Sequence, residues 1–434
     1  MATPDSNEEH EPTRSPKIAL PGSEPPVIPP PLPVARKAAR LTPAAIIAIC
    51  LGAATLCWAV GLLGSKILAQ GGGSGARESK SEPGLTYENI RVASHPWSIH
   101  VLKIDRSRKD LTFFAAHAKD KVLGVSLLAE QARAVPREFG RAVAGINGDF
   151  YVRDNPTYAG DPRGLQILNG ELISGPDTVC VWFSDDGTPH LDEVKGDFHV
   201  TWPDGTKVPF GLNRQRPPNM VVLYTPTYGS TTRAKGGIEL ILEKEGTGAW
   251  LPLKASDTYT VRVKEVVTDG NTRLVPDTMV LSIPPDLLAR VPQPSVGTSL
   301  QIVTATTPDL KGIKTAIGGG PAILKEGKPI ALKPATQGAA NFSERSKYER
   351  HPRSAIGWSP THIYLVTVDG RQPGLSVGMK LAELAEFMAG LGCTDAMNFD
   401  GGKSAQMWMS GQIMNSPCQG EDTIANSLLL LRKL

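Results

Sequence analysis

Residues 363–402 read IYLVTVDGRQPGLSVGMKLAELAEFMAGLGCTDAMNFDGG, and they contain a strand, a helix and a second strand in succession. The first apolar run ends at Asp369, which a glycine follows, and this is typical of a buried strand that enters a turn. Apolar residues then recur at helical spacing over 379–391. The second strand ends at Asp400, again before a glycine. Two strands that each end in Asp-Gly therefore enclose one helix.

Short strands also dominate the rest of the C-terminal part. Residues 141–151 form an apolar run that ends in polar turn residues, and 190–310 alternate strand patterns with Gly, Pro and Asp turns. Asn-Gly at 169–170 and Glu-Gly at 326–327 predict tight hairpins. A further helix is expected over 121–134. The predicted fold class is α+β, with strand-rich mixed sheets and few helices.

Composition excludes two classes of protein. The chain has 434 residues, of which 40% are hydrophobic, so a purely disordered chain is not expected. Its 46 Lys and Arg residues balance 43 Asp and Glu residues to a net charge of +3, without a basic block. Nucleic acid is therefore not an expected partner.

One segment is long and apolar enough to cross a membrane. Residues 44–64 contain 21 amino acids without a charge, close to the roughly 20 that a spanning helix needs. Arg36, Lys37 and Arg40 precede the segment and Lys66 follows it, which predicts a single-pass anchor with a cytoplasmic N-terminus. A cleaved signal peptide and a buried core helix remain alternatives. The anchor would place the C-terminal part outside the cytoplasm, in a bacterial periplasm or at the cell surface.

The anchor divides the chain into four predicted parts. Residues 1–43 form a Pro-rich, disordered cytoplasmic tail, and 44–64 form the transmembrane anchor. Residues 65–86 form a Gly/Ser-rich linker, and 87–434 form the folded domain. The outward part holds three cysteines, and the sequence leaves open whether Cys393 and Cys418 pair.

Polar residues at the strand ends are the candidates for chemistry. Asp149, Asp369 and Asp400 can supply an acid, a base or a nucleophile, because glycosyl transfer needs two carboxyl groups beside the bond that breaks. Guanidinium groups match pairs of phosphate oxygens, and three arginines stand near these turns, Arg163, Arg353 and Arg371. The alternative is that the turns are ordinary hairpins and the charges are solvated or paired at the surface.

Several stretches together resemble successive motifs of the phosphodiester glycosidase family. They are GINGDFY (145–151), GLQILNGELIS (164–174), AIGGGPAIL (316–324), HPRSAIGW (351–358), the run from Val368 to Met407, and IANSLLLL (424–431). The resemblance extends over residues 87–434. It implies hydrolysis of a sugar-1-phosphodiester, with release of free sugar and a phosphomonoester, by a membrane-anchored extracytoplasmic enzyme. It requires no cofactor, and it implies a phosphodiester-linked glycan or glycolipid as the substrate.

The resemblance also assigns the predicted site residues by position. Asp400, Asp369 and Asp149 are the predicted catalytic carboxyl groups. The predicted substrate-binding residues are Asn147, Arg163, Arg353, Gly370, Arg371, Asn398, Gly401, Gly402, Lys403 and Ser404. Arg353 and Arg371 would hold the phosphate, and Asn147 and Asn398 would contact sugar hydroxyls. Relatives usually continue the Asp-Gly-Gly turn with small residues and a Ser-Thr pair, whereas this chain has Lys, Ser, Ala and Gln at 403–406.

Two other functions remain alternatives. In the first, the three carboxyl groups bind a divalent cation that activates water, and the protein is a metal-dependent phosphodiesterase. In the second, the protein is a non-catalytic envelope glycan-binding domain that kept the fold with an altered site, and the residues at 403–406 support this reading.

Overall fold

The structure, a computed structural model, describes residues 78–434 except 177, 249, 294 and 333–344. These residues belong to one compact unit of the chain. The predicted tail and the predicted anchor at 44–64 lie outside the described residues. Among the residues that are described, no helix has the length and apolar character needed to span a membrane.

The first sheet has eight strands in the order β1-β2-β3-β20-β19-β21-β17-β18. They are β1 (Glu78–Glu82), β2 (Leu85–Val92), β3 (Trp97–Asp105), β17 (Ala322–Lys325), β18 (Lys328–Pro329), β19 (Arg353–Trp358), β20 (His362–Val368) and β21 (Asp395–Asn398). Because β20 and β21 both pair antiparallel with β19, they run in the same direction. The turns that follow β20 and β21 therefore lie at one edge of the sheet, beside the start of β19.

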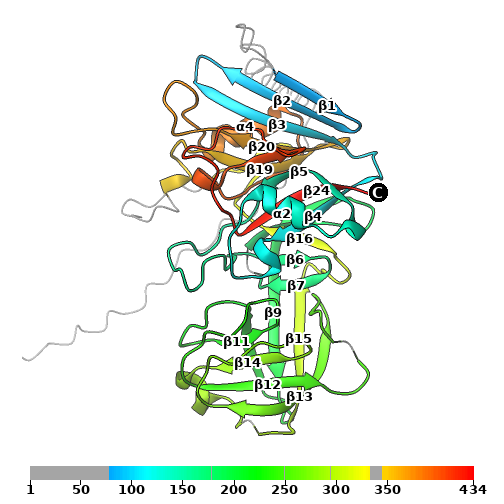
Figure 1. The fold of residues 1–434 in the computed structure, drawn as a ribbon, viewed down its shortest axis with the longest axis vertical. Coiled ribbons are helices and arrows are strands. Elements are labelled where there is room, and N and C mark those ends of the chain that lie inside the picture. The colour runs from blue at the N-terminus through cyan, green and yellow to red at the C-terminus, as the bar shows by residue number, and fades with distance from the viewer. Residues whose placement is uncertain (1–77, 177, 249, 294, 333–344) are drawn as a thin grey trace, which may run out of the picture. The chain divides into compact units, whose positions relative to one another are not determined.

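The second sheet has five antiparallel strands in the order β23-β22-β5-β24-β4. They are β4 (Leu111–His117), β5 (Arg141–Asn147), β22 (Met407–Met409), β23 (Gln412–Ile413) and β24 (Asn426–Arg432). This sheet brings segments from both ends of the described chain together, since β24 at the C-terminus lies between β4 and β5 (Figure 1).

These two sheets and two helices form four layers. Leu428 and Leu430 of β24 face a core shared with the eight-stranded sheet, whereas Leu429 and Leu431 face helix α2 (Leu128–Ala134). The alternation follows from the two-residue repeat of a strand. Helix α4 (Leu381–Gly390) covers the other side of the eight-stranded sheet, where its apolar residues share one core with residues of β3, β19 and β20. The order of layers is helix, sheet, sheet, helix.

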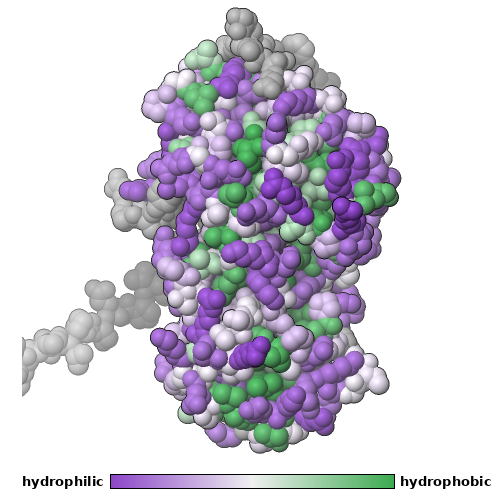
Figure 2. Space-filling model, in the orientation of Figure 1, coloured by the Kyte–Doolittle hydropathy of each residue, from purple (hydrophilic) through white to green (hydrophobic). Residues whose placement is uncertain are grey.

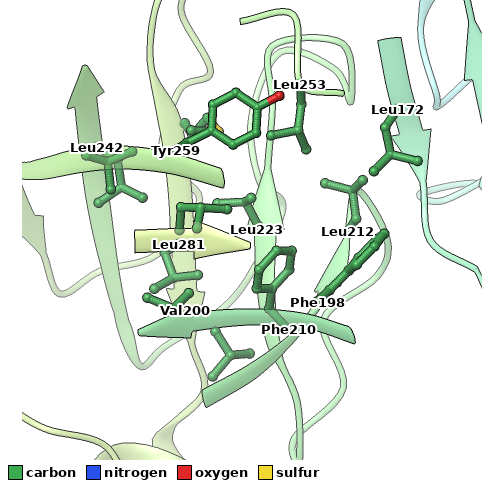
Figure 3. Packing of buried hydrophobic residues seen from close by; sticks show 14 of the residues in the cluster. Leu172, Phe198, Val200, Phe210, Leu212, Leu223, Leu242, Leu253, Tyr259 and Leu281 are labelled. Carbon is green, nitrogen blue, oxygen red and sulfur yellow. The ribbon is translucent and has the colours of Figure 1, made fainter. Parts of the chain in front are cut away.

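The third sheet has eleven strands in the order β10-β11-β14-β12-β13-β15-β9-β8-β16-β6-β7. They are β6 (Gln166–Leu168), β7 (Glu171–Ser174), β8 (Thr178–Phe183), β9 (Pro189–Thr201), β10 (Lys207–Leu212), β11 (Val221–Tyr224), β12 (Ile238–Lys244), β13 (Thr258–Val267), β14 (Met279–Ile283), β15 (Ser299–Thr307) and β16 (Thr315–Gly318). An additional pairing of β10 with β9 closes seven of these strands into a ring around an apolar core. Figure 3 shows part of this core, including Phe198 and Phe210, whose ring centroids are 5.8 Å apart.

Most of the predicted elements are confirmed. The predicted strands are present, and the hairpin turns at 169–170 and 326–327 have the positive φ angles that favour Asn and Gly. Two α-helices, α2 and α4, lie wholly within the described residues, and α4 confirms the helix predicted over 379–391. The described residues also form short 3-10 helices, which are η2 (Ala118–Asp120), η3 (Arg137–Phe139), η4 (Pro285–Arg290) and η5 (Gly402–Ser404). The strand-rich architecture with few helices is therefore confirmed.

Two predicted boundaries are wrong. The helix expected over 121–134 begins only at Leu128, because backbone groups of 122–126 bond to other segments, such as Val122 N–H to the Thr227 carbonyl at 2.9 Å. The linker predicted over 65–86 is wrong for residues 78–86, since β1 and the start of β2 form a hairpin there. Gly84 in that hairpin turn has a φ of 79°, so the glycine that resembled a linker residue is a turn residue.

The cysteines and the surface add two observations. Cys180, Cys393 and Cys418 are all free, so the open question of a Cys393–Cys418 disulfide is answered in the negative. Figure 2 shows a face on which hydrophilic residues dominate and apolar residues are scattered among them. Phe150 is one of the few exposed large apolar side chains in the described part, and it directly follows Asp149.

Candidate active site

The ends of β5 and β21 are hydrogen-bonded to each other, although the two strands belong to different sheets. Asn147 Nδ2 donates to the Asp400 carbonyl at 2.7 Å, and the Asp400 N–H donates to the Gly148 carbonyl at 3.0 Å. Asn147 Oδ1 accepts from Ser354 Oγ at 2.6 Å and from the Gln406 N–H at 3.1 Å. The buried Asn147 amide, predicted to contact sugar, thus joins three segments of the protein.

Asp149 lies in a narrow space that glycines create. Its side chain is 2% exposed, Oδ1 accepts the Phe150 N–H at 2.8 Å, and Oδ2 accepts the Gly164 N–H at 2.6 Å. A Cβ on Gly318 would stand 2.9 Å from Asp149 Oδ2, so the carboxyl group needs this glycine. Burial raises the pKa of Asp149 to about 7, and the negative charge of Asp400 adds to the rise.

Asp400 is the more accessible of the two carboxyl groups. It is half-buried, and its Oδ1 accepts the Gly401 N–H at 2.8 Å. Desolvation raises the pKa of Asp400 to about 6, and the positive charges of Arg153 and Arg371 oppose that rise. Two adjacent turns therefore hold two carboxyl groups that both titrate near neutral pH, which is uncommon outside functional sites.

Asp369 has a different environment. It is 1% exposed, and its Oδ2 is 2.8 Å from His100 Nε2. Its Oδ1 accepts from the Ser416 N–H at 2.8 Å and from Asn415 Nδ2 at 3.2 Å. The same Asn415 amide donates to the Ala405 carbonyl at 3.0 Å, in the loop after Asp400. Asp369 is therefore enclosed by protein partners, and it supports the loop that carries Asp400.

The two arginines predicted to hold phosphate also differ. Arg353 is buried, its Nε donates to the Met379 carbonyl at 2.8 Å, and its Nη2 donates to the Ser346 and Glu349 carbonyls at 2.5 and 2.9 Å. Burial, with the nearby charge of Arg371, lowers the pKa of Arg353 to about 10. These bonds direct the Arg353 guanidinium at the protein's own backbone.

Arg371 is exposed, and its guanidinium lies against the turn after Asp400. A Cβ on Gly402 would be 3.3 Å from Arg371 Nη1, and Arg371 Nη2 is 3.2 Å from His351 Nδ1. Asp400 is within electrostatic reach, since Arg371 contributes to its pKa. Of the two arginines, Arg371 is the one placed beside the half-buried carboxyl group.

The remaining predicted residues fall into three groups. Gly370 and Gly401 pack against Pro352, where an added Cβ would lie 2.7 and 2.6 Å from backbone atoms. Lys403 is exposed. Arg163 is exposed too, and it lines a cavity of about 510 Å³ that none of Asp149, Asp369 and Asp400 lines.

Buried polar atoms without a hydrogen-bond partner gather around the two joined turns. Among the described residues they belong to His117, Gln166, Thr178, Asn398, Ser404, Gln406 and Asn426. Each such atom costs about 1–3 kcal/mol when it stays unpaired, and native proteins pair most of them with water or ligand. Asn398 Nδ2 bonds to the Gly320 carbonyl at 2.9 Å, so its free Oδ1 is the atom left for a ligand.

The sequence did not identify several of these residues. Gln166 Nε2 is 3.4 Å from Asp149 Oδ2, and Asn426 Oδ1 accepts the Asp149 N–H at 2.6 Å. His117 pairs in register with Asn426, and burial lowers its pKa to about 4, so it is uncharged at neutral pH. Arg153 follows the GINGDFY motif by two residues, and this closeness in sequence is the one signal that pointed to it.

A metal centre was an alternative for the three carboxyl groups. In the described part of the chain, no three His, Cys, Asp or Glu side chains are grouped so that they could hold a metal ion.

Comparison with known proteins supports the resemblance. The phosphodiester glycosidase family model matches residues 254–431, which include Asp369 and Asp400 but not Asp149. An uncharacterised protein of Bacillus subtilis (strain 168), the SPbeta prophage-derived YomE, is 29% identical over 122 residues, which are 28% of this chain and 18% of YomE.

Two solved structures have a similar fold. A hypothetical protein from Synechocystis matches with a TM-score of 0.65 and 19% identity, over 82% of this chain and 64% of that protein. A protein from Burkholderia pseudomallei K96243, described as exported, matches with a TM-score of 0.57 and 23% identity, over 77% of this chain and 74% of that protein. At these identities the likeness shows the fold alone. The chain spans less than two thirds of the Synechocystis protein and under a fifth of YomE.

Proposed function

Because residues 254–431 match the phosphodiester glycosidase family model, we propose that this protein hydrolyses a sugar-1-phosphodiester to free sugar and a phosphomonoester. The observation that carries the proposal is the pair of turns that hold Asp149 and Asp400, whose pKa values burial raises to about 7 and about 6. Glycosidic hydrolysis needs two carboxyl groups in opposite protonation states, and unequal environments supply them.

The two carboxyl groups have separate roles in this proposal. Asp400 is half-buried and is ionised at neutral pH, so it acts at the anomeric carbon, as a nucleophile or as the base that activates water. Asp149 holds its proton to higher pH and donates it to the leaving oxygen. The rate should therefore peak between about pH 6 and pH 7, because the reaction needs Asp400 ionised and Asp149 protonated.

Neighbouring groups suit the other parts of the substrate. Arg371 and Arg153 bring positive charge near Asp400, and they are the groups proposed to bind the phosphate. The exposed Phe150 ring, next to Asp149, offers an apolar surface for one face of the sugar. Asn398 Oδ1, buried and without a hydrogen-bond partner among the described residues, is proposed to accept a hydrogen bond from a sugar hydroxyl.

Hydrolysis in ¹⁸O-labelled water tests the reaction class. Cleavage of the sugar–oxygen bond places the label in the free sugar, whereas a phosphodiesterase that attacks phosphorus places it in the phosphate. The substrates are chromogenic sugar phosphodiesters, and the matched control is Asp269→Asn, an exposed carboxyl group on a loop. Label found only in the phosphate, or equal turnover by the parent and Asp400→Asn, would contradict the proposal.

The proposed location is the outer side of a membrane, with residues 44–64 as the anchor. The apolar segment and the basic residues before it support this placement. In cell fractions washed with carbonate, the full chain should stay with the membrane, and a chain without residues 44–64 should not. Release of the full chain by the wash would contradict the anchor without affecting the proposed reaction.

A further inference from the structure

A cavity outside the two joined turns has no role in the chemistry described above. It has a volume of about 510 Å³ and lies against β9, β10 and η4, beside the segment from Asp161 to Arg163. Its apolar walls include Phe198, Phe210 and Val291. This volume falls in the range of about 300–1,000 Å³ that is typical of sites for small organic ligands.

Four cationic side chains line the same cavity. They are Arg163, Lys207, Arg214 and Arg290, and all four are exposed. The side chains of these four residues form no ion pair or hydrogen bond with any other described residue, whereas Arg216 nearby donates to Ser282 Oγ at 2.8 Å and to three carbonyls. The cavity therefore presents unpaired positive charge beside an apolar wall.

One acidic group lies among these charges. Asp161 is 5% exposed, and its Oδ2 accepts the Gln215 N–H at 3.1 Å. Burial raises the pKa of Asp161 to about 6, while Arg214 and Arg163 act in the opposite direction. A single buried carboxylate against four cations leaves the cavity positive at neutral pH.

The cavity and the candidate active site share one short segment of chain. The Gly164 N–H donates to Asp149 Oδ2, and the preceding residue, Arg163, lines the cavity. Ser174, which also lines the cavity, donates from Oγ to the Gly164 carbonyl at 2.6 Å. A ligand held by Arg163 would therefore lie within one residue of the backbone that holds Asp149.

We propose that this cavity binds an amphipathic anion, a second phosphate carried on an apolar chain at the end of the substrate remote from the sugar, separate from the phosphodiester that Arg371 and Arg153 are proposed to bind. The unpaired cations match the phosphate, and the wall of Phe198, Phe210 and Val291 matches the apolar chain. A space of this volume is large enough for one short alkyl chain. The assignment as part of the substrate rests on the proposed function, and the binding itself does not.

Calorimetric titration with hexyl phosphate tests the binding. The parent should bind hexyl phosphate at least tenfold more tightly than inorganic phosphate, because the second probe lacks the apolar chain. The double variant Arg163→Gln/Arg214→Gln should bind hexyl phosphate at least tenfold more weakly than the parent. The matched control is Arg133→Gln/Arg137→Gln, two exposed arginines of α2 and η3 that do not line the cavity, and it should bind as the parent does.

Equal affinity of the parent and the cavity variant, or no binding by the parent, overturns the proposal. If the double variant does not fold, the single variants Arg214→Gln and Arg290→Gln replace it, with an expected loss of at least threefold each. Titration of Asp400→Asn separates the two hypotheses. Asp400→Asn should bind hexyl phosphate as the parent does, because Asp400 does not line the cavity. Charge-dependent binding by a parent that cleaves no sugar phosphodiester overturns the proposed reaction alone, whereas cleavage by the parent without this binding overturns the cavity alone.

Discussion

The turns after β20 and β21 have the same sequence pattern, but their Asp side chains have different surroundings. Each turn places an Asp-Gly pair at the same edge of the eight-stranded sheet. Around Asp369, the partners His100, Asn415 and Ser416 occupy both carboxylate oxygens. Asp400 is half-buried and accepts one backbone N–H, from its own turn. The pattern thus predicts where a carboxyl group lies, and its neighbours decide how exposed it is.

The largest effect should come from removing the free carboxyl group. Asp400→Asn should lower kcat on a sugar phosphodiester by about 10³-fold or more, because it removes a nucleophile or base from the reaction. Thermal unfolding should change little, since Asp400 has few protein partners. Initial rates with Asp269→Asn as the control give the ratio. A loss below tenfold would place Asp400 with Asp369 as a structural residue.

The second-largest effect should be on the pH dependence of stability, and it should come from Asp149. Its pKa is raised from its usual value to about 7, so the folded state binds the proton more tightly than the unfolded state does. The parent should lose roughly 4 kcal/mol of stability from this group as pH rises from about 4 to 7, at about 1.4 kcal/mol per pKa unit. Asp149→Asn should lack this part of the slope. Urea unfolding of both proteins across that range measures it, and parallel slopes would contradict the expectation.

The enclosed carboxyl group should matter for folding. Asp369→Asn leaves the buried partners of its lost oxygen unpaired and should lower the free energy of unfolding by about 1–3 kcal/mol. Activity per folded molecule should fall much less than in Asp400→Asn. Denaturant unfolding and active-site-normalised rates give the two numbers. An unchanged stability with a thousandfold slower rate would reverse the contrast between the two turns.

The two arginines extend the same contrast. Arg371→Gln should raise KM about tenfold with little change in unfolding, because the exposed guanidinium is proposed to bind the substrate phosphate. Arg353→Gln should lower thermal stability and leave KM nearly unchanged, since its bonds go to backbone carbonyls. The opposite result, a KM effect confined to Arg353, would support the original prediction for that residue.

The smallest effect is expected at Lys403. Its side chain is exposed, so Lys403→Gln should change kcat/KM by no more than about twofold at moderate salt. Rates measured at two salt concentrations check this. A tenfold lower kcat/KM for Lys403→Gln, with a similar decrease in the parent at high salt, would assign Lys403 to substrate recognition.

The elements that were predicted correctly are those that interactions between sequence neighbours determine. The Asn-Gly hairpin at 169–170 and helix α4 depend on neighbours in sequence, and both were predicted correctly. The pairing of Asp369 with His100 joins residues 269 positions apart, and no local pattern encodes it. The same limit explains why the role predicted for Arg353 differs from its contacts. Its place in the chain is visible in the sequence, but the backbone carbonyls that accept its hydrogen bonds are not. The sequence predicts Asp149 and Asp400 as carboxyl groups at strand ends, but it does not identify Gln166 and Asn426, which contact Asp149.

Asp149 follows a strand of one sheet, and Asp400 follows a strand of the other. The gap between their carboxyl groups therefore depends on the spacing of the two sheets, which core side chains such as Ile146 and Met397 set. A change of one methyl group in that core can alter the gap without touching any residue that meets the sugar. Substrate preference in such a protein can thus evolve through its interior, while the residues at the site stay the same.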